Sequence, residues 1–349
     1  MRSFQLAAFG APLVAADGEP PVPRGREVLV RTLACGVCHS DVHLADGYFD
    51  LGNGNRIDLA RSLHLPRTLG HEIVGEVVAL GPDAEGVAVG DARVVFPWIG
   101  CGACAECAGG REHLCGAPRA LGINRDGGFA DHVLVDDARY LFDFAPLSAP
   151  QACTLACSGL TAFSALRKTL PLPPGAHALV IGAGGVGLSA IRMAHAVLGM
   201  PVLVADPDER TWPLALAAGA AGTFDPGAAG AVREVMRTSG GGVAAAFDFV
   251  GSGDSFGFGF STLAKGGHLV VVGLMGGATQ FSPAMLPMKA VTVSGSFVGS
   301  LAEMNELMHL ARSGVLPAMP VTVRALDAVD RAIDDLRERR VRGRVVVTP

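Results

Sequence analysis

Short apolar runs alternate with helical patterns through the second half of the chain. Strands are predicted over five segments of this half, at 175–181, 201–206, 244–250, 268–273 and 291–294. Helical patterns lie between them, including 188–198 and 255–263. Apolar strands separated by helices are typical of a doubly wound parallel sheet that has helices on both faces. We therefore expect an α/β unit of about 140 residues here, which is a normal domain size.

The first half of the chain has the shorter alternation of polar and apolar positions that indicates β-strands. Segments 27–34, 73–80 and 87–95 carry this pattern and are bounded by turns rich in glycine and proline. The segment 47–69 is polar and has little regular pattern, so we expect a long functional or mobile loop there. The first half is therefore predicted to form an irregular, mostly β domain.

Helical patterns follow the predicted sheet at 301–313 and 329–340, and a strand is predicted at 343–347. These helices and this strand do not extend the predicted parallel sheet, and we expect them to return to the first domain. The predicted organisation is a first domain over 1–156, a second domain over 157–296 and a returning segment over 297–349.

Composition limits the classes of protein that fit this pattern. The chain has 349 residues, half of them hydrophobic, so it can bury sizeable cores. Its net charge of −5 predicts no surface for nucleic acid or for an anionic membrane. The most membrane-like run, 176–205, includes four glycines within 182–187, and a strand, turn and helix explain it better than a membrane span. Eight cysteines without a secretory leader pattern predict a soluble, cytoplasmic protein with reduced thiols.

A dense group of chemically active residues lies between Cys35 and His43, with two thiols, two imidazoles, a hydroxyl and a carboxylate. Such a group favours a metal site or proton chemistry. His71 and Cys157 can complete a site with Cys38, and zinc is the natural metal for two thiolates and one imidazole. Three protein ligands leave a fourth position open, which is typical of a catalytic zinc.

A second set of cysteines predicts a separate metal site in a lobe over 98–116. Two successive C-x-x-C spacings and a fourth cysteine provide its ligands, Cys101, Cys104, Cys107 and Cys115. Four thiolates around a tetrahedral zinc leave no open position, so this site is expected to be structural. An iron–sulfur cluster is the rival occupant, although the run lacks the Cys-Pro ending of bacterial ferredoxins.

Cys35 and Cys153 remain outside these two sets. Cys35 forms a C-x-x-C spacing with Cys38, which is also the spacing of redox pairs. We favour a buried, unreactive thiol at a strand end for Cys35, and a core position for Cys153.

A dinucleotide fingerprint lies between the first predicted strand and helix of the α/β unit. Its residues Gly182, Gly184, Gly185, Val186 and Gly187 fit G-x-G-x-x-G, with glycines that let the backbone approach a pyrophosphate. Asp206 ends the second strand and is expected to accept the ribose hydroxyls, although Asp206-Pro207 also fits a helix N-cap. We add Arg210, Val250 and Gly273 to the predicted cofactor contacts.

Five motifs occur in a fixed order: G-V-C-H-S-D-x-H from Gly36, G-H-E from Gly70, C-x2-C-x2-C-x7-C from Cys101, Cys157-x3-Thr161, and G-A-G-G-V-G from Gly182. In these motifs the chain resembles the zinc-dependent alcohol dehydrogenases of the medium-chain dehydrogenase/reductase family over nearly its whole length. The resemblance implies a GroES-like catalytic domain, a Rossmann domain that binds NAD, two zinc ions per chain and a homodimer or homotetramer.

The resemblance also implies roles for individual residues. Cys38, His71 and Cys157 match the catalytic zinc ligands, Glu72 matches an acid that can exchange onto the zinc, and Asp41 matches the carboxylate that orients His71. Ser40 and His43 match a proton relay, although His43 also fits an ordinary surface histidine. The remaining matches are cofactor contacts, at His39 and Arg344 for the pyrophosphate and at Thr161 for the nicotinamide end.

The implied reaction is reversible hydride transfer between an apolar primary or secondary alcohol, or its aldehyde or ketone, and NAD. Tyr48, Phe49, Trp98 and Leu121 are expected to form the pocket wall, although the three aromatic residues also fit ordinary core positions. Three alternatives remain. The first is a polyol dehydrogenase, which Cys157 disfavours because Glu is the usual third ligand in that group. The second is a zinc-free quinone reductase, which Cys38 and His71 disfavour, and the third is a non-catalytic NAD- or zinc-binding module. The long 47–69 segment and the position of Trp98 near Cys101 leave the identity of the substrate open.

Overall fold

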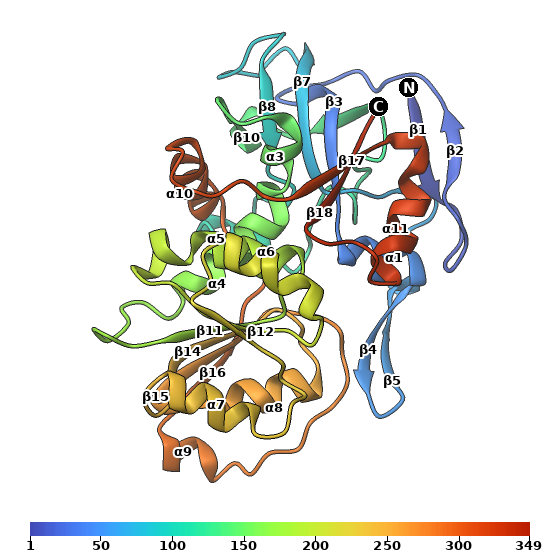
Figure 1. Ribbon diagram of the computed structural model, residues 1–349. Helices are drawn as coiled ribbons and strands as arrows, with labels where there is room; N and C mark the ends of the chain where they lie inside the picture. Colours follow the sequence, from blue (N-terminus) through green and yellow to red (C-terminus); the bar gives the residue numbers. More distant parts are fainter.

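The computed structural model describes all 349 residues and consists of two sheet-based parts, one above the other in Figure 1. The upper part holds a seven-stranded sheet in the order β10-β8-β7-β3-β18-β17, with β9 also paired to β3. Its strands are β3 (Val28–Val37), β7 (Glu72–Leu80), β8 (Ala92–Val95), β9 (His132–Val135), β10 (Leu141–Phe142), β17 (Val321–Ala325) and β18 (Arg344–Thr348). A smaller sheet joins β1 (Arg2–Leu6), β2 (Val14–Asp17) and β6 (Arg67–Thr68).

The last part of the chain lies on the upper sheet, although it follows the lower one in sequence. β18 pairs antiparallel with β3, so that Val346 faces Gly36 and Val347 faces Cys35. Both chain termini therefore lie at the upper end of the molecule (Figure 1). This pairing brings Arg344, at the start of β18, close to the strand that leads to Cys38.

The lower part is a six-stranded parallel sheet in the order β13-β12-β11-β14-β15-β16. Its strands are β11 (Ala178–Ile181), β12 (Leu203–Ala205), β13 (Gly222–Phe224), β14 (Val243–Asp248), β15 (Leu263–Val271) and β16 (Thr292–Gly295). The order reverses between β11 and β14, which defines a doubly wound Rossmann sheet and confirms the predicted fold class.

Helices pack around both sheets, and each of the predicted helical segments is present. The helices are α1 (His39–Asp46), α2 (Ala105–Ala108), α3 (Ala149–Cys153), α4 (Leu160–Arg167), α5 (Gly185–Leu198), α6 (Trp212–Ala217), α7 (Ala231–Thr238), α8 (Gly253–Thr262), α9 (Met285–Lys289), α10 (Leu301–Arg312) and α11 (Val329–Arg337). Because the membrane-like run 176–205 consists of β11, a turn, α5 and β12, it does not form one long helix. Nowhere in the structure is a helix both long enough and apolar enough to cross a lipid bilayer.

The core joins the two parts through one face of the Rossmann sheet. Ala178 and Val180 of β11 belong to the large core cluster that continues into the upper sheet, whereas Leu179 and Ile181 belong to a separate cluster on the opposite face. This division follows from the alternation of side chains along a strand. The upper and lower parts therefore share one continuous apolar core.

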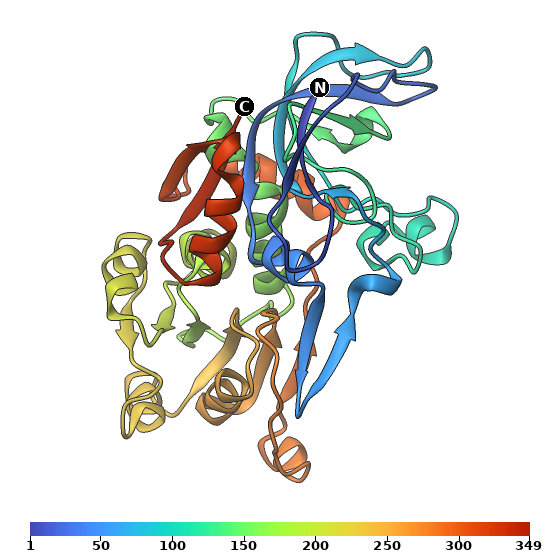
Figure 2. The ribbon, with the colours of Figure 1, turned by 90° about the vertical axis from the view of Figure 1, so that its right-hand side faces the viewer.

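Two sequence expectations in the first half were wrong. The segment 47–69 is largely regular: β4 (Tyr48–Gly52) and β5 (Asn55–Asp58) form an antiparallel hairpin that extends downwards in Figures 1 and 2. Asn53 and Gly54 have φ values of 53° and 78°, as a two-residue hairpin turn requires. A Cβ on Gly52 would collide with the backbone of Gly277, so the hairpin reaches the lower part of the molecule. The strand expected over 87–95 is also shorter, because Gly90 has a φ of 95° just before β8 begins.

Candidate active site

Cys38 is placed by the junction of β3 with α1. It occupies the N-cap of α1 with an extended backbone, and its N–H donates a hydrogen bond of 2.8 Å to Oδ2 of Asp41. A helix N-terminus favours negative charge, which suits a thiolate. The neighbouring Cys157 thiol and His71 ring also hold the pKa of Cys38 well below its usual range.

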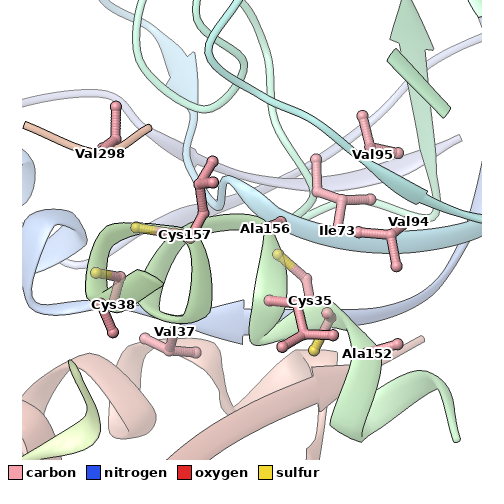
Figure 3. Packing of buried hydrophobic residues seen from close by; sticks show 14 of the residues in the cluster. Cys35, Val37, Cys38, Ile73, Val94, Val95, Ala152, Ala156, Cys157 and Val298 are labelled. Carbon is pink, nitrogen blue, oxygen red and sulfur yellow. The ribbon is translucent and has the colours of Figure 1, made fainter. Parts of the chain in front are cut away.

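Four buried side chains converge at this point: Cys38, His71, Glu72 and Cys157, whose ligand atoms all lie within 4.8 Å of one another. They come from three separate regions of the chain, with Cys157 on a single π-helical turn over Leu155–Gly159. Figure 3 shows the sulfurs of Cys38 and Cys157 directed to the same side, while Cys35 lies among the buried side chains of the core. The structure thus brings together the three predicted catalytic ligands and the predicted exchanging acid.

The environment of His71 fits a metal ion. Nδ1 of His71 lies 3.5 Å from Oδ1 of Asp41, while neither ring nitrogen has a hydrogen-bond partner although the ring is fully buried. Buried polar atoms without hydrogen-bond partners are rare, and a metal ion bound to Nε2 of His71 would give that nitrogen its missing partner. Oδ2 of Asp41 accepts a hydrogen bond from the N–H of Cys38, so the carboxylate of Asp41 faces two of the three predicted ligands.

Glu72 has a partner that the sequence analysis did not predict. Its Oε2 accepts a hydrogen bond from the buried guanidinium of Arg344, and its Oε1 accepts one of 3.1 Å from the N–H of Ser158. Arg344 also lies against the glycine-rich loop, since a Cβ on Gly185 would collide with its side chain. Arg344 therefore links the candidate metal site to the candidate pyrophosphate site through Glu72, whose carboxylate stays within 4.8 Å of the other three ligand atoms.

The predicted relay residues lie on α1 beside the cluster. Oγ of Ser40 is 3.7 Å from Sγ of Cys38. His43 follows Ser40 by three residues, which places both on one face of the helix. His43 is half-buried, with its ring centroid 5.3 Å from that of His39 and 5.0 Å from that of Phe49. Burial lowers the pKa of His43 below 6.5, so the ring is mostly neutral at pH 7.

The four cysteines of the predicted lobe also converge. Sγ of Cys107 lies 3.9 Å from Sγ of Cys101 and 3.5 Å from Sγ of Cys104, and the Cys104–Cys115 separation is 3.7 Å. Four thiolates around a tetrahedral zinc, each bonded at about 2.3 Å, would stand ~3.8 Å apart. Backbone N–H groups of Ala103 and Cys104 lower the pKa of Cys101 to about 6. The spacing therefore fits a closed, four-thiolate metal site.

Glu112 anchors this lobe to the body of the upper domain, and the sequence analysis missed it. Its buried carboxylate accepts hydrogen bonds from the Tyr140 hydroxyl, at 2.7 Å, and from the N–H of Gly100, at 3.2 Å. Arg139 forms an ion pair with the same carboxylate at 3.0 Å. A single glutamate between two cysteines of a metal motif gives no sequence signal for this role.

The glycine-rich loop between β11 and α5 has the geometry of a dinucleotide site. Gly182 has a φ of 89°, and a Cβ there would collide with Val250. A Cβ on Gly187 would collide with the carbonyl of Gly182, whereas a Cβ on Gly184 would meet nothing within 4 Å. Only glycine fits the two outer positions, and the middle glycine faces open space at the start of α5, where a pyrophosphate would bind. Gly273 packs directly against Val250 at the same edge of the sheet.

Asp206 stabilises this loop, and the N-cap interpretation of Asp206 was wrong. Its Oδ2 accepts a 2.6 Å hydrogen bond from the N–H of Ala183, and its Oδ1 accepts one of 2.8 Å from the N–H of Asp208. The next short helix starts at Glu209, and Asp208 is its N-cap. Nε and Nη2 of Arg210 donate hydrogen bonds of 2.6 and 2.8 Å to the two carboxylate oxygens of Asp208.

The expected pocket wall is only partly present. Trp98 is buried beside the metal cluster, with its ring centroid 5.4 Å from that of His71, and the half-exposed Phe297 lies edge-on to it at 6.0 Å. Leu121 is fully buried in the core, and Tyr48 stacks against Arg56 on the hairpin. Thr161 lies on α4, four residues after Cys157, with little exposed surface. Cys153, like Cys35, is a free and buried thiol, as expected.

Comparison with known proteins agrees with this geometry. Residues 24–145 match the alcohol dehydrogenase GroES-like domain, and residues 185–313 match the zinc-binding dehydrogenase family. An NAD-dependent alcohol dehydrogenase of Sulfurisphaera tokodaii is 39% identical, with 100% of both chains covered. The chain belongs to the zinc-binding alcohol dehydrogenase family of medium-chain dehydrogenases/reductases.

Solved structures and one further relative extend the comparison. The crystal structure of the alcohol dehydrogenase from Aeropyrum pernix superposes with a TM-score of 0.90, at 31% identity and 100% coverage of both chains. A D-arabinose 1-dehydrogenase (NADP+) of Saccharolobus solfataricus is 30% identical over 100% of this chain and 97% of its own. The family thus includes a relative named for a sugar substrate and for NADP.

Proposed function

We propose that the protein is a zinc-dependent alcohol dehydrogenase that transfers hydride reversibly between apolar alcohols and NAD. The observation that carries the proposal is the buried cluster of Cys38, His71 and Cys157, whose imidazole nitrogens have no partner and which Glu72 and Arg344 connect to the glycine-rich loop. We further propose two zinc ions per chain, a catalytic unit over 1–156 and 297–349, and a cofactor unit over 157–296.

The residues of the chain divide the work of the proposed reaction. Zinc held by Cys38, His71 and Cys157 would act as a Lewis acid and lower the pKa of the alcohol hydroxyl. Asp41 orients His71, and Arg344 fixes the carboxylate of Glu72 beside the three ligands. Trp98 covers one side of His71 and excludes water from it. Ser40 accepts the hydroxyl proton at Oγ as its own hydroxyl proton moves on towards His43, and His43 releases a proton to solvent.

The substrate class provides the test of the proposed function. Trp98 and Phe297 give the space beside His71 an aromatic lining, so we expect hexanol or benzyl alcohol to be oxidised with NAD faster than sorbitol. NADH absorbance at 340 nm, measured at matched subsaturating alcohol concentrations, gives kcat/KM for each substrate. Faster turnover of sorbitol or D-arabinose would favour the polyol alternative, and no turnover of any of them by the zinc-loaded protein would refute the enzyme.

Cofactor preference provides a second prediction. Asp208 neutralises Arg210, so a 2′-phosphate near Asp206 would meet carboxylates in place of a free guanidinium. We expect NAD to be preferred over NADP, and Asp208→Asn to raise kcat/KM for NADP by ~10–100-fold, the value of one or two charge-assisted hydrogen bonds. The dissociation constant of NADPH, measured by protein fluorescence, should fall in parallel.

Two control variants separate this effect from general damage. Glu209→Gln removes a neighbouring charge that does not bind Arg210 and should change the preference little. Asp206→Ala should weaken both cofactors, because Asp206 also holds the N–H of Ala183 in the glycine-rich loop. Similar kcat/KM values for NAD and NADP in the unaltered protein would contradict the assignment.

A further inference from the structure

The segment that joins α11 to β18 lies where the two parts of the molecule meet, as the red loop between these elements in Figure 1. At its start, Nη2 of Arg337 donates a hydrogen bond of 2.9 Å to Oδ1 of Asp46, at the end of α1. At its end, Gly343 packs against the glycine-rich loop, because a Cβ on Gly185 would lie 3.3 Å from the carbonyl oxygen of Gly343. Residues 338–342 therefore connect α1 with the start of α5, where the pyrophosphate of a dinucleotide would bind.

This segment carries a dense group of positive charges in a chain whose net charge is −5. Five arginines and one glutamate lie within residues 337–344. Three of these arginines form ion pairs with carboxylates, namely Arg337, Arg340 and Arg344. The other two, Arg339 and Arg342, are exposed and take part in no ion pair. Two guanidinium groups without a partner therefore remain on the segment.

The charges of these two arginines reach the candidate cofactor site. Hydrogen bonds from Arg210 lower the pKa of Asp208, beside the candidate ribose site, and Arg342 is close enough to lower this pKa further. Burial lowers the pKa of His39, at the start of α1, and the nearby charge of Arg339 lowers it further. Arg342 therefore lies on the adenosine side of the start of α5, and Arg339 lies on the side of α1.

The backbone of Arg339 is strained. Its φ of 55° is in the left-handed region, where a side chain costs free energy and glycine does not. Arg339 directly follows Glu338, the C-cap of α11, at the position where glycine commonly ends a helix. An arginine thus occupies a position that favours glycine, which points to a role for its side chain.

We propose that Arg339 and Arg342 are further cofactor-binding residues, whose guanidinium groups attract and contact the pyrophosphate at the start of α5. The inference rests on the proposed use of NAD. Guanidinium groups bind phosphate oxygens through paired, charge-assisted hydrogen bonds. Because Arg210 already binds Asp208, Arg342 is free to face the phosphates. Exposed charges also attract an anion over a distance, so these arginines should speed association in a way that salt weakens.

Stopped-flow fluorescence of NADH binding to the zinc-loaded protein tests the proposal without any turnover. We expect the dissociation constant to rise about 5-fold in Arg342→Met and in Arg339→Gly, and more than about 10-fold in the double variant. Much of the change should lie in the association rate, and it should shrink as sodium chloride is added. Arg339→Gly should also raise the unfolding temperature by about 1–3 °C, because glycine adopts the left-handed backbone without strain.

Arg331→Met is the matched control, because it removes the same charge from an exposed position on α11, outside the segment. It should keep the parental affinity and association rate. Parental affinity for NADH in the double variant would overturn the proposal. A loss of affinity confined to NADPH would also overturn it, since the arginines would then contact the 2′-phosphate.

Two further outcomes separate this inference from structural damage and from the proposed function. Weaker binding in Arg339→Gly together with a lower unfolding temperature would overturn the inference, because the loss would then come from a disturbed fold. Absence of NADH binding in the unaltered protein would overturn both the inference and the proposed function. Every other outcome leaves the proposed function standing.

Discussion

Replacing Cys38 with serine should abolish alcohol oxidation, whereas replacing Cys104 with serine should mainly lower stability. Cys38 belongs to the buried cluster that leaves a position for substrate, and loss of several kcal/mol of Lewis-acid stabilisation slows turnover by ~1,000-fold or more. Cys104 belongs to the closed four-thiolate set, where metal binding contributes to folding. We therefore expect each variant to lose a different one of two zinc ions.

Three measurements on the Cys38→Ser and Cys104→Ser proteins test these expectations: zinc content by elemental analysis, initial rates of alcohol oxidation, and thermal unfolding. Cys35→Ala is the matched control: Cys35 is equally buried and three residues from Cys38, but it is outside both clusters. It should keep two zinc ions per chain and most of the activity. A freshly purified protein with one zinc per chain, or a Cys104→Ser protein that keeps both ions, would contradict the assignment.

Local sequence signals predicted five of the six Rossmann strands because these strands carry their own apolar pattern, and they missed β13, which has only three residues. They failed for the hairpin of β4 and β5, since the residues of β5 are all exposed and leave no apolar alternation to detect. The Asn53-Gly54 pair was a usable signal for this turn, and the strand analysis overlooked it. A pattern based on burial does not detect a strand such as β5, which buries none of its residues.

The chemistry of the site was predictable where the ligands have short, characteristic spacings. The ion pair of Glu72 with Arg344 joins residues 272 positions apart, and no spacing rule relates them. The role of Asp206 was predicted incompletely for a similar reason, because its bond to Ala183 depends on how closely β11 and β12 approach. Such contacts follow from the tertiary fold rather than from local sequence.

The proton relay gives the second large effect, and His43→Gln should slow alcohol oxidation at pH 7 by ~10–100-fold. Burial lowers the pKa of His43 below 6.5, so the neutral ring is available as an acceptor at pH 7. Acidification through that pKa protonates the ring, and the rate of the unaltered protein should fall over this range. In His43→Gln this fall should disappear, and higher pH or small-molecule bases should restore much of the lost rate.

Two further variants distinguish a relay from simple disturbance of α1. Ser40→Ala removes the hydroxyl nearest Sγ of Cys38, and it should slow the reaction more than His43→Gln without rescue by added base. His39→Gln alters the ring that packs against His43, yet it should mainly weaken NAD binding if His39 contacts the pyrophosphate. The pH–rate profiles of kcat and of kcat/KM separate these cases. A His43→Gln enzyme with the parental profile would remove His43 from the proton path, because glutamine cannot titrate in its place.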